Sequence, residues 1–257
     1  MKKILVLASL AVVAMIGCKS DDNPASNEGS GRMQVTMVDA PASAYDSIII
    51  SVQLVEIHAS NSASADSWIT LNSEAKTYNL LSLVNGVEAV LGEADLAAGT
   101  YTQMRLVLGD SCYVYAGSVR IALKVPSSEI KLNINAAIRA NITYKLVLDF
   151  DATRSLVTTG TGLILKPVIK VLTTSSTGSI EGSINTKASV MAIGGGDTLS
   201  TITGSNNSFK IKYVKPGTYD LMIISGSIAF YDTTLTNISV ASGQVTNVGT
   251  INLRAKL

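Results

Sequence analysis

The chain has 257 residues, of which 47% are hydrophobic and 15% are charged, and its formal net charge is +1 at pH 7. This composition can bury a core, and the balance of 20 basic and 19 acidic side chains provides no basic surface of the kind that neutralises phosphates. We therefore expect a folded protein that does not bind nucleic acid.

The first segment has the pattern of an export signal. Two lysines precede an unbroken apolar run over residues 4–16, and Gly17 stands directly before Cys18. The run is shorter than the roughly 20 residues that cross a bilayer, which favours a cleaved signal peptide over residues 1–17 and disfavours a retained membrane helix. The alternative is a plain secretory signal in which Cys18 is incidental.

The end of this segment resembles a bacterial lipobox, in which Cys18 becomes the acylated first residue of the mature protein, and several acyl chains on one residue anchor a protein stably. The residues that follow resemble the acidic export tag of Bacteroidota surface lipoproteins; they are Lys19, Ser20, Asp21 and Asp22. An ordinary polar tether is the alternative. These resemblances imply a lipid-anchored outer-membrane protein that faces the cell exterior, with residues 18–30 as a flexible tether. If Cys18 is acylated, Cys112 has no disulfide partner, and we expect it to be a small buried hydrophobe.

From residue 31 onward, short alternating segments broken by Gly, Pro, Asn, Asp and Ser predict strands. The predicted strands are 33–37, 48–57, 68–71, 100–108, 119–125, 130–134, 142–150 and 163–172. In the second of these the apolar phase shifts near Gln53 or Leu54, which indicates a β-bulge. The segment 78–91 fits a helical turn as well as a buried strand, and a turn or short helix is predicted over 152–155.

A small polar break over residues 173–177 predicts a domain boundary. The strands predicted beyond it are 180–184, 190–193, 199–202, 209–213, 219–224, 228–231, 238–240 and 248–253. The pattern of half-apolar strands predicts an all-β protein with a sandwich or closed barrel over 31–172 and a smaller β-domain over 178–257. We adopt two β-sandwiches as the predicted fold.

Four groups of residues in the first domain together resemble an uncharacterised family of bacterial lipoprotein domains. They are Asp39-Ala40-Pro41; Ala98-Gly99-Thr100-Tyr101 with Arg105-Leu106; Leu148-Asp149-Phe150-Asp151 with Arg154-Ser155; and Leu165-Lys166-Pro167-Val168-Ile169-Lys170. This family has no established activity, so the resemblance implies a β-rich exported module. The second domain resembles the carboxypeptidase-regulatory-like, transthyretin-type sandwich through Phe209-Lys210-Ile211 and Val214-Lys215-Pro216-Gly217-Thr218-Tyr219, although Asn206-Asn207-Ser208 replaces the usual Asp-Gly. That resemblance implies a stabilising or interaction domain without a catalytic set.

Few residues are suited to catalysis. His58 is the single histidine, it ends a predicted strand, and no nucleophile elbow or cluster of metal ligands accompanies it. Asp149 and Asp151 lie two apart on a strand, so they project from one side about 6 to 7 Å apart, a spacing that suits paired carboxylates or a calcium site. We favour a structural role, in which Arg105, Arg154 or Lys166 pairs with them and Asp151 caps the following turn. No cofactor is expected unless calcium binds there.

A second candidate surface contains Tyr113 and Tyr115 on one strand face, with Trp68 as the single indole. Aromatic rings stack on sugars, which would make these residues glycan contacts, but a packed tyrosine pair is the favoured interpretation.

These observations predict a non-enzymatic surface lipoprotein that acts as a binding or scaffolding module. Its partners would be the membrane, through the lipid anchor, and a protein in or on the outer membrane, as an adhesin or an accessory subunit. The alternative is a glycan-binding component of a nutrient-uptake system. A hydrolase that uses Asp149 and Asp151 is less favoured, because it would need a cleft between the domains and a raised carboxyl pKa.

Overall fold

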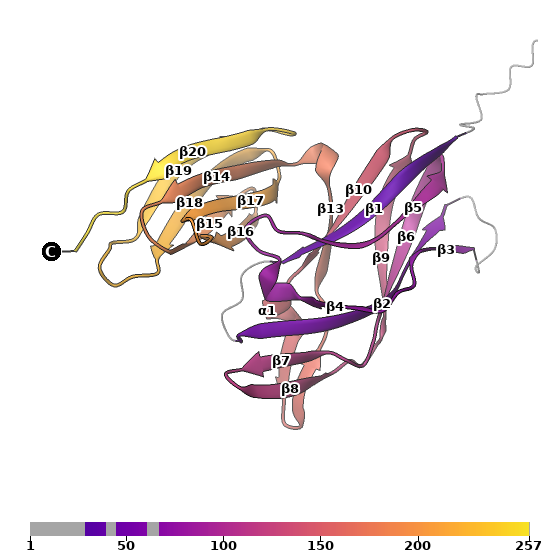
Figure 1. Cartoon of the computed structure of the whole chain (residues 1–257). Coiled ribbons are helices and arrows are strands. Elements are labelled where there is room, and N and C mark those ends of the chain that lie inside the picture. Colours follow the sequence, from indigo (N-terminus) through magenta and orange to yellow (C-terminus); the bar gives the residue numbers. More distant parts are fainter. Residues whose placement is uncertain (1–28, 40–44, 61–66, 257) are drawn as a thin grey trace, which may run out of the picture.

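The computed structural model describes residues 29–39, 45–60 and 67–256, and it forms two β units joined through η2 (Thr174–Ser176) (Figure 1). The prediction of an all-β fold is confirmed, since the longest helix among the described residues, α1 (Ala152–Ser155), has four residues. No helix in this part of the chain has the length and apolar character needed to cross a bilayer.

The first unit pairs a four-stranded sheet with a larger one. The smaller sheet has the order β13-β10-β1-β5, with β1 (Ser30–Asp39), β5 (Ala89–Ala97), β10 (Thr143–Phe150) and β13 (Ile169–Thr173). Strand β1 is parallel to β10 and antiparallel to β5. The larger sheet has the order β11-β12-β8-β7-β2-β6-β9, and β3 and β4 also pair with β2. Its strands are β2 (Ser47–Ala59), β3 (Trp68–Asn72), β4 (Lys76–Asn79), β6 (Gly99–Leu108), β7 (Tyr113–Ala116), β8 (Val119–Lys124), β9 (Glu129–Ile138), β11 (Leu156–Thr159) and β12 (Gly162–Leu165).

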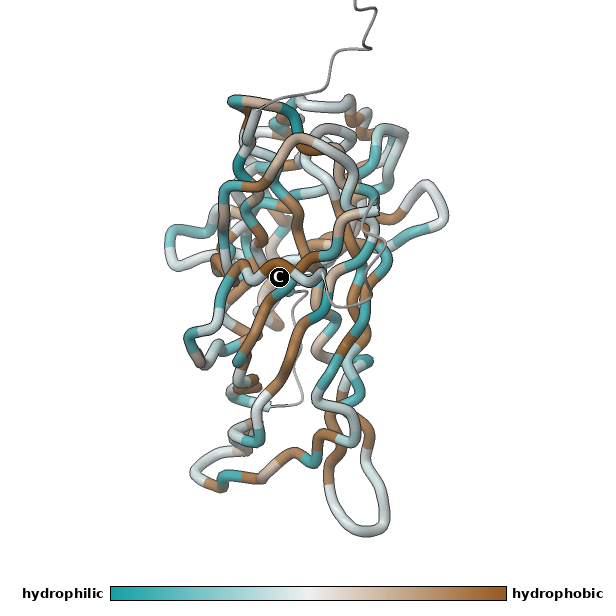
Figure 2. Tube along the Cα trace, turned by 90° about the vertical axis from the view of Figure 1, so that its right-hand side faces the viewer, coloured by the Kyte–Doolittle hydropathy of each residue, from teal (hydrophilic) through white to brown (hydrophobic). Residues whose placement is uncertain are grey.

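The alternation of apolar residues places one face of each strand in the core, because successive side chains point to opposite faces. In β1, the side chains of Met33, Val35 and Met37 are completely buried. Figure 2 shows how hydrophobic and hydrophilic residues follow one another along the whole chain. The expected bulge is present, since the pairing of β2 with β6 shifts between Val52 and Leu54.

Two sequence expectations in the first unit are resolved by the sheets. The ambiguous segment 78–91 contains the end of β4, the short helix η1 (Leu80–Ser82), a turn and the start of β5. The single strand predicted over 163–172 is wrong: β12 pairs with β8 in the larger sheet, whereas β13 pairs with β10 in the smaller one. The chain crosses between the sheets at Pro167, which has no N–H to donate to a ladder.

The second unit packs a three-stranded sheet, β17-β14-β20, with a four-stranded sheet, β16-β15-β18-β19. The strands are β14 (Gly178–Ile184), β15 (Ala188–Gly194), β16 (Asp197–Ile202), β17 (Ser208–Val214), β18 (Gly217–Ser225), β19 (Thr233–Val240) and β20 (Val245–Ile251). Its own buried cluster includes Phe209, Tyr219 and Leu221. The strand predicted over 228–231 is wrong, since this stretch contributes one bridge, between Phe230 and Ala255.

Candidate functional site at the seam between the two units

A tight turn of the first unit reaches the second unit. Between η1 and β5, the N–H of Val87 donates to the carbonyl of Val84 at 3.1 Å, and the two central residues have positive φ, 56° at Asn85 and 78° at Gly86. Two consecutive positive φ values are typical of a type I′ turn, for which Asn-Gly is the preferred pair. We call residues 85–88 the latch loop.

Asn85 pairs with the second unit as a neighbouring strand would. Its amide oxygen accepts from the N–H of Lys210 at 2.6 Å, its amide nitrogen donates to the carbonyl of Ser208 at 3.4 Å, and its backbone N–H donates to Oγ1 of Thr201 at 3.0 Å. Strand β17 is an edge strand of its sheet, so these bonds satisfy backbone groups that would otherwise face solvent. The first unit therefore covers an edge of the second.

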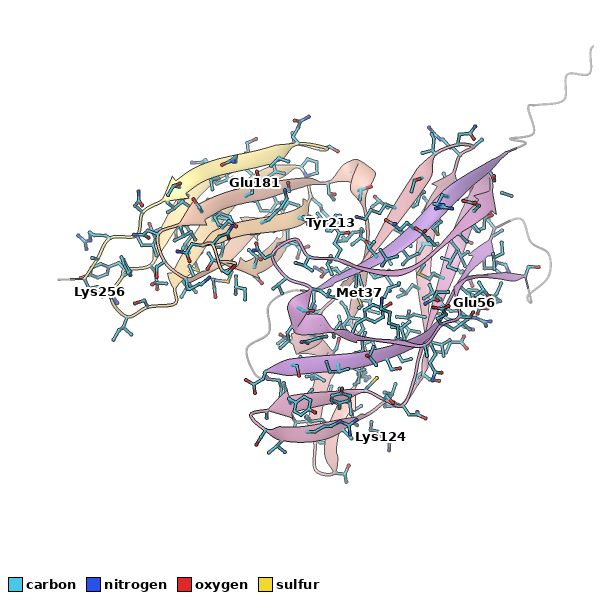
Figure 3. The ribbon with its side chains drawn as sticks, viewed as in Figure 1. Met37, Glu56, Lys124, Glu181, Tyr213 and Lys256 are labelled. Carbon is cyan, nitrogen blue, oxygen red and sulfur yellow. The ribbon has the colours of Figure 1, made fainter. Side chains whose placement is uncertain are left out.

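Glu88, at the end of the latch loop, receives three charged or polar donors. Nζ of Lys145 lies 2.5 Å from Oε2, while Nζ of Lys212 and the hydroxyl of Tyr213 lie 2.8 and 2.6 Å from Oε1. Lys145 belongs to the first unit and the other two donors to the second, and Figure 3 places Tyr213 where the units meet. Burial alone would raise the pKa of Glu88, but these hydrogen bonds outweigh it and lower the pKa to about 2.

A second ion pair crosses the seam beside Asp149. Nζ of Lys170, on β13, lies 2.9 and 3.1 Å from the two carboxylate oxygens of Asp197, on β16. Asp149 lies directly opposite Lys170 in the ladder. Burial raises the pKa of Asp149 to about 6, the charge of Lys170 opposes this rise, and the carboxylates of Asp151 and Asp197 add to it.

A cavity of about 100 Å³ lies between the units beside these ion pairs. Its wall includes Asp149, Asp151 and Lys170 from the first unit and Lys212 and Tyr213 from the second. The structure therefore brings together the two requirements for a hydrolase, a space between the domains and a raised carboxyl pKa. A substrate-binding cleft usually measures about 300 to 1,000 Å³, so this enclosed cavity by itself is smaller than a typical substrate site. An open hollow of about 440 Å³ lies beside it and is lined by Asp151, Lys170 and Asp197.

Asp151 lies at a structural corner. Its Oδ1 accepts from the N–H of Arg154 at 2.9 Å and caps α1, and the Arg154 guanidinium lies 3.9 Å from Oδ2. The hydroxyl of Ser155 donates to the Asp151 carbonyl and accepts from the N–H of Val168. Oδ1 of Asp39, on β1, accepts from the N–H of Ala152. Three of the segments that resemble the lipoprotein family, around residues 39, 149–155 and 165–170, therefore meet in space. They hold the chain where it passes from one sheet to the other.

The other expected partners of the aspartates lie elsewhere. Arg105, on β6, pairs with Glu56 across the ladder, because these two residues are register partners in the larger sheet. Lys166 donates its backbone N–H to the carbonyl of Ser155, and no ion pair joins its side chain to either aspartate within the described ranges. Lys170, which follows four residues later, faces Asp149 instead.

The aromatic candidates do not form one platform. The rings of Tyr113 and Tyr115 contact edge to face at 5.6 Å, and the Arg120 guanidinium lies 4.0 Å from the Tyr113 centroid. The Trp68 and His58 ring centroids are 5.3 Å apart, and the Arg105 guanidinium carbon lies 4.5 Å from the Trp68 centroid. Strand β2 pairs with Tyr113 at Ile49 and with Trp68 at His58, so about 30 Å of strand separates the two aromatic groups.

The lipidation and export-tag candidates, Cys18, Lys19, Ser20, Asp21 and Asp22, lie outside the described residues. Cys112 is buried, and its thiol donates to the carbonyl of Gly109 at 3.3 Å. Burial raises the pKa of this thiol, so it is a poor nucleophile. Among the described residues, no group of three or more His, Cys, Asp or Glu side chains is arranged to hold a metal ion.

Asn85 and Glu88 are not among the candidate residues that the sequence predicts. The available signal was the Asn-Gly pair inside an apolar segment, which indicates a turn. The partners on β17 lie more than 110 residues later in the chain and could not be identified from any local pattern.

Comparison with known proteins gives one family match. The model of the family described as "Domain of unknown function (DUF4382)" matches residues 30–167. No match was found among curated proteins.

Solved structures give distant likenesses. The Bacillus anthracis TIE protein is 11% identical with a TM-score of 0.27; the match covers 89% of this chain, which spans only 34% of that protein. The minor pilin GBS52 of Streptococcus agalactiae is 12% identical with a TM-score of 0.24 and coverages of 88% and 97%. The shaft pilin spaA of Lactobacillus rhamnosus GG is 8% identical with a TM-score of 0.22 and coverages of 89% and 98%. TM-scores this low support no conclusion about fold or function.

Proposed function

The chain belongs to the family described as Domain of unknown function (DUF4382), and from this premise we propose that it is a non-enzymatic lipoprotein of the outer membrane in which two β-sandwiches form one rigid binding or scaffolding body. Acylated Cys18 anchors it, and the acidic residues after Cys18 direct it to the cell exterior. Its partner is a protein in or on the outer membrane.

The observation that carries this proposal is the seam. The first unit supplies the latch loop and Lys170, and the second unit supplies the edge of β17 and Asp197. The bonds from Lys212 and Tyr213 to the shielded Glu88 carboxylate contribute about 1.5 to 3 kcal/mol each, whereas the exposed Lys170–Asp197 pair adds little, and together they resist bending between the units. A rigid body with long edges and exposed loops suits a protein that holds a partner in place.

The test is purification of the tagged, acylated protein from its own outer membrane in mild detergent, with Cys18→Ala beside it. We expect incorporation of radiolabelled palmitate in the parent and its loss in Cys18→Ala. We also expect outer-membrane proteins to co-purify in fixed ratio with the parent. An unlabelled parent would contradict the anchor, and a labelled parent that emerges alone would contradict the accessory-subunit role.

Glycan binding has weaker support. Arg120 lies over the Tyr113 ring, and Trp68, on β3, pairs with the far end of β2, so a sugar would meet a single tyrosine pair. A glycan array compares the parent with Tyr113→Ala; binding that disappears in this variant would favour the uptake role over the scaffold.

A further inference from the structure

The end of the second unit that lies farthest from the first carries four side chains that the proposed function does not use. They are Ile228, Tyr231, Arg254 and Lys256, which we call the distal tip. Figure 3 labels Lys256 at this end, and Figure 1 shows β1 beginning on the opposite side of the molecule.

Backbone pairing brings these residues together. The N–H of Tyr231 donates to the carbonyl of Arg254 at 2.9 Å, and the N–H of Lys256 donates to the carbonyl of Ala229 at 2.8 Å. Phe230 bridges to Ala255 and packs against the core of the unit. Because side chains alternate along an extended chain, Tyr231 points away from that core.

The distal tip combines an apolar side chain with a ring and two cations. Ile228 is 94% exposed, the most exposed of the large hydrophobic residues in the described part of the chain, and Tyr231 is 44% exposed. The Arg254 guanidinium lies 4.5 Å and the Lys256 ammonium 5.2 Å from the centroid of Tyr231. The ring therefore holds both cations next to the exposed loop.

The two cations are not neutralised by carboxylates of the described residues. None of the ion pairs in this part of the chain includes Arg254 or Lys256. The nearest acid in sequence, Asp232, accepts from the backbone N–H of Ser225 and keeps its charge, so two cations stand against this one carboxylate. The distal tip is thus both apolar and positive.

The apolar character continues onto the adjacent sheet. Ile202, at the end of β16, is 41% exposed and Ile224, near the end of β18, is 40% exposed. Both pair with Ser189 on β15, so they lie in one row across the sheet, close to the start of the loop that contains Ile228.

We propose that the distal tip binds the surface of a lipid bilayer that contains anionic headgroups. Ile228 enters the acyl boundary, Tyr231 lies at the interface where amphipathic rings are favoured, and Arg254 and Lys256 contact the headgroups. A protein partner fits less well, because a stable protein interface buries about 800 Å² on each partner around an apolar centre, whereas the exposed Ile228 protrudes here beside two cations.

The proposal rests on the lipid anchor of the proposed function. One apolar side chain and two cations bind a bilayer weakly, but an anchored protein presents them at a high effective concentration. Residues 19–28, which precede the described part of the chain, can span at most about 35 Å, a reach that lets the molecule lie along the membrane with both ends in contact.

The test uses the mature, acylated protein reconstituted into vesicles. Ile228→Cys is labelled with an environment-sensitive fluorophore, and Val119→Cys, on β8 of the first unit and 59% exposed, is the matched control. Cys112 is buried and has a raised pKa, so it does not compete for the label. The vesicles contain phosphatidylcholine alone or with phosphatidylglycerol, and spin-labelled lipids quench a probe that enters the bilayer.

We expect quenching several-fold stronger at position 228 than at position 119, and only in the anionic vesicles. Arg254→Ser and Lys256→Ser should each reduce the inserted fraction about fivefold, whereas Lys124→Ser on β8 should not change it. Equal quenching at both positions in a protein that stays vesicle-bound would overturn the proposal while leaving the anchor intact. A protein that fails to remain on the vesicles would contradict the anchor itself. The proposal would also be overturned if the probe at position 228 were not quenched and an acidic protein co-purified with the parent but not with Arg254→Ser or Lys256→Ser.

Discussion

Glu88 shows how one carboxylate can join two units. Its side chain is only 12% exposed, and a charge this buried is stable only because Lys145, Lys212 and Tyr213 donate to it. Burial, and next to it the hydrogen bond to Glu88 and the charge of that carboxylate, raise the pKa of Tyr213, so this hydroxyl stays protonated as a donor.

We expect Glu88→Gln to lower the free energy of unfolding by about 2 to 3 kcal/mol at pH 7, since it removes one charge from a paired site. The folded pKa of about 2 lies below the ordinary value of 4.5, so the stability from Glu88 is full above pH 4.5 and is lost as the pH falls toward 2. Urea titrations at pH 7 and pH 3 measure this. Glu93→Gln, at an exposed pair on β5, is the control, and equal losses for both variants would contradict the role of Glu88.

The contribution of Asp149 to stability changes with pH in the opposite direction to that of Glu88. Its folded pKa of about 6 lies above the ordinary value of 3.8, so its contribution to stability is full below pH 3.8 and is lost as the pH rises through 6. We expect Asp149→Asn to be more stable than the parent by about 1 to 2 kcal/mol at pH 7.5 and similar to it at pH 4. Thermal melts at the two pH values test this, and an unchanged pH dependence would count against a buried Asp149.

At the scale of elements, the latch loop depends on the left-handed backbone of Asn85. Asn85→Gly keeps this conformation but removes the amide bonds to Lys210 and Ser208, for an expected loss of about 1 to 3 kcal/mol. Asn85→Ala should lose about 1 kcal/mol more, because a φ of 56° is strained for alanine. Chemical denaturation compares both with Asn207→Gly, a half-buried turn residue with a φ of 62°. A loss for Asn207→Gly as large as that for Asn85→Gly would show that the seam contacts are not responsible.

The corner at α1 allows a test for calcium. We expect Asp151→Ala to lower stability by about 1 kcal/mol through loss of the cap on the N–H of Arg154, and a chelator should change the melting temperature of neither protein. A chelator that destabilises the parent but not Asp151→Ala would favour a calcium site at Asp149 and Asp151.

At the scale of the whole molecule, the seam should hold the units at one distance. Spin labels at Val119→Cys and Val245→Cys, which are exposed on different units, are expected to give a narrow distance distribution by electron paramagnetic resonance. Combining Asn85→Gly with Glu88→Gln should broaden it. A broad distribution in the parent would contradict a rigid body and with it the proposed scaffold.

The sequence by itself determined most of the strands, the bulge in β2 and the all-β class. These features follow from alternation and from turn residues, which are properties of neighbouring residues. The same local reasoning selected Asp149 and Asp151, because their spacing places both on one side of a strand.

Only the tertiary structure decided which residues meet. Residues 163–172 read as one strand, but the two halves pair with different sheets, and Arg105 pairs with Glu56 because the register of β2 and β6 sets its neighbour. The seam depends on partners such as Asn85 and Lys210, which are 125 residues apart. No periodicity encodes such a pair, since the packing of the two units against each other determines which side chains face one another and which carboxylates are withdrawn from water.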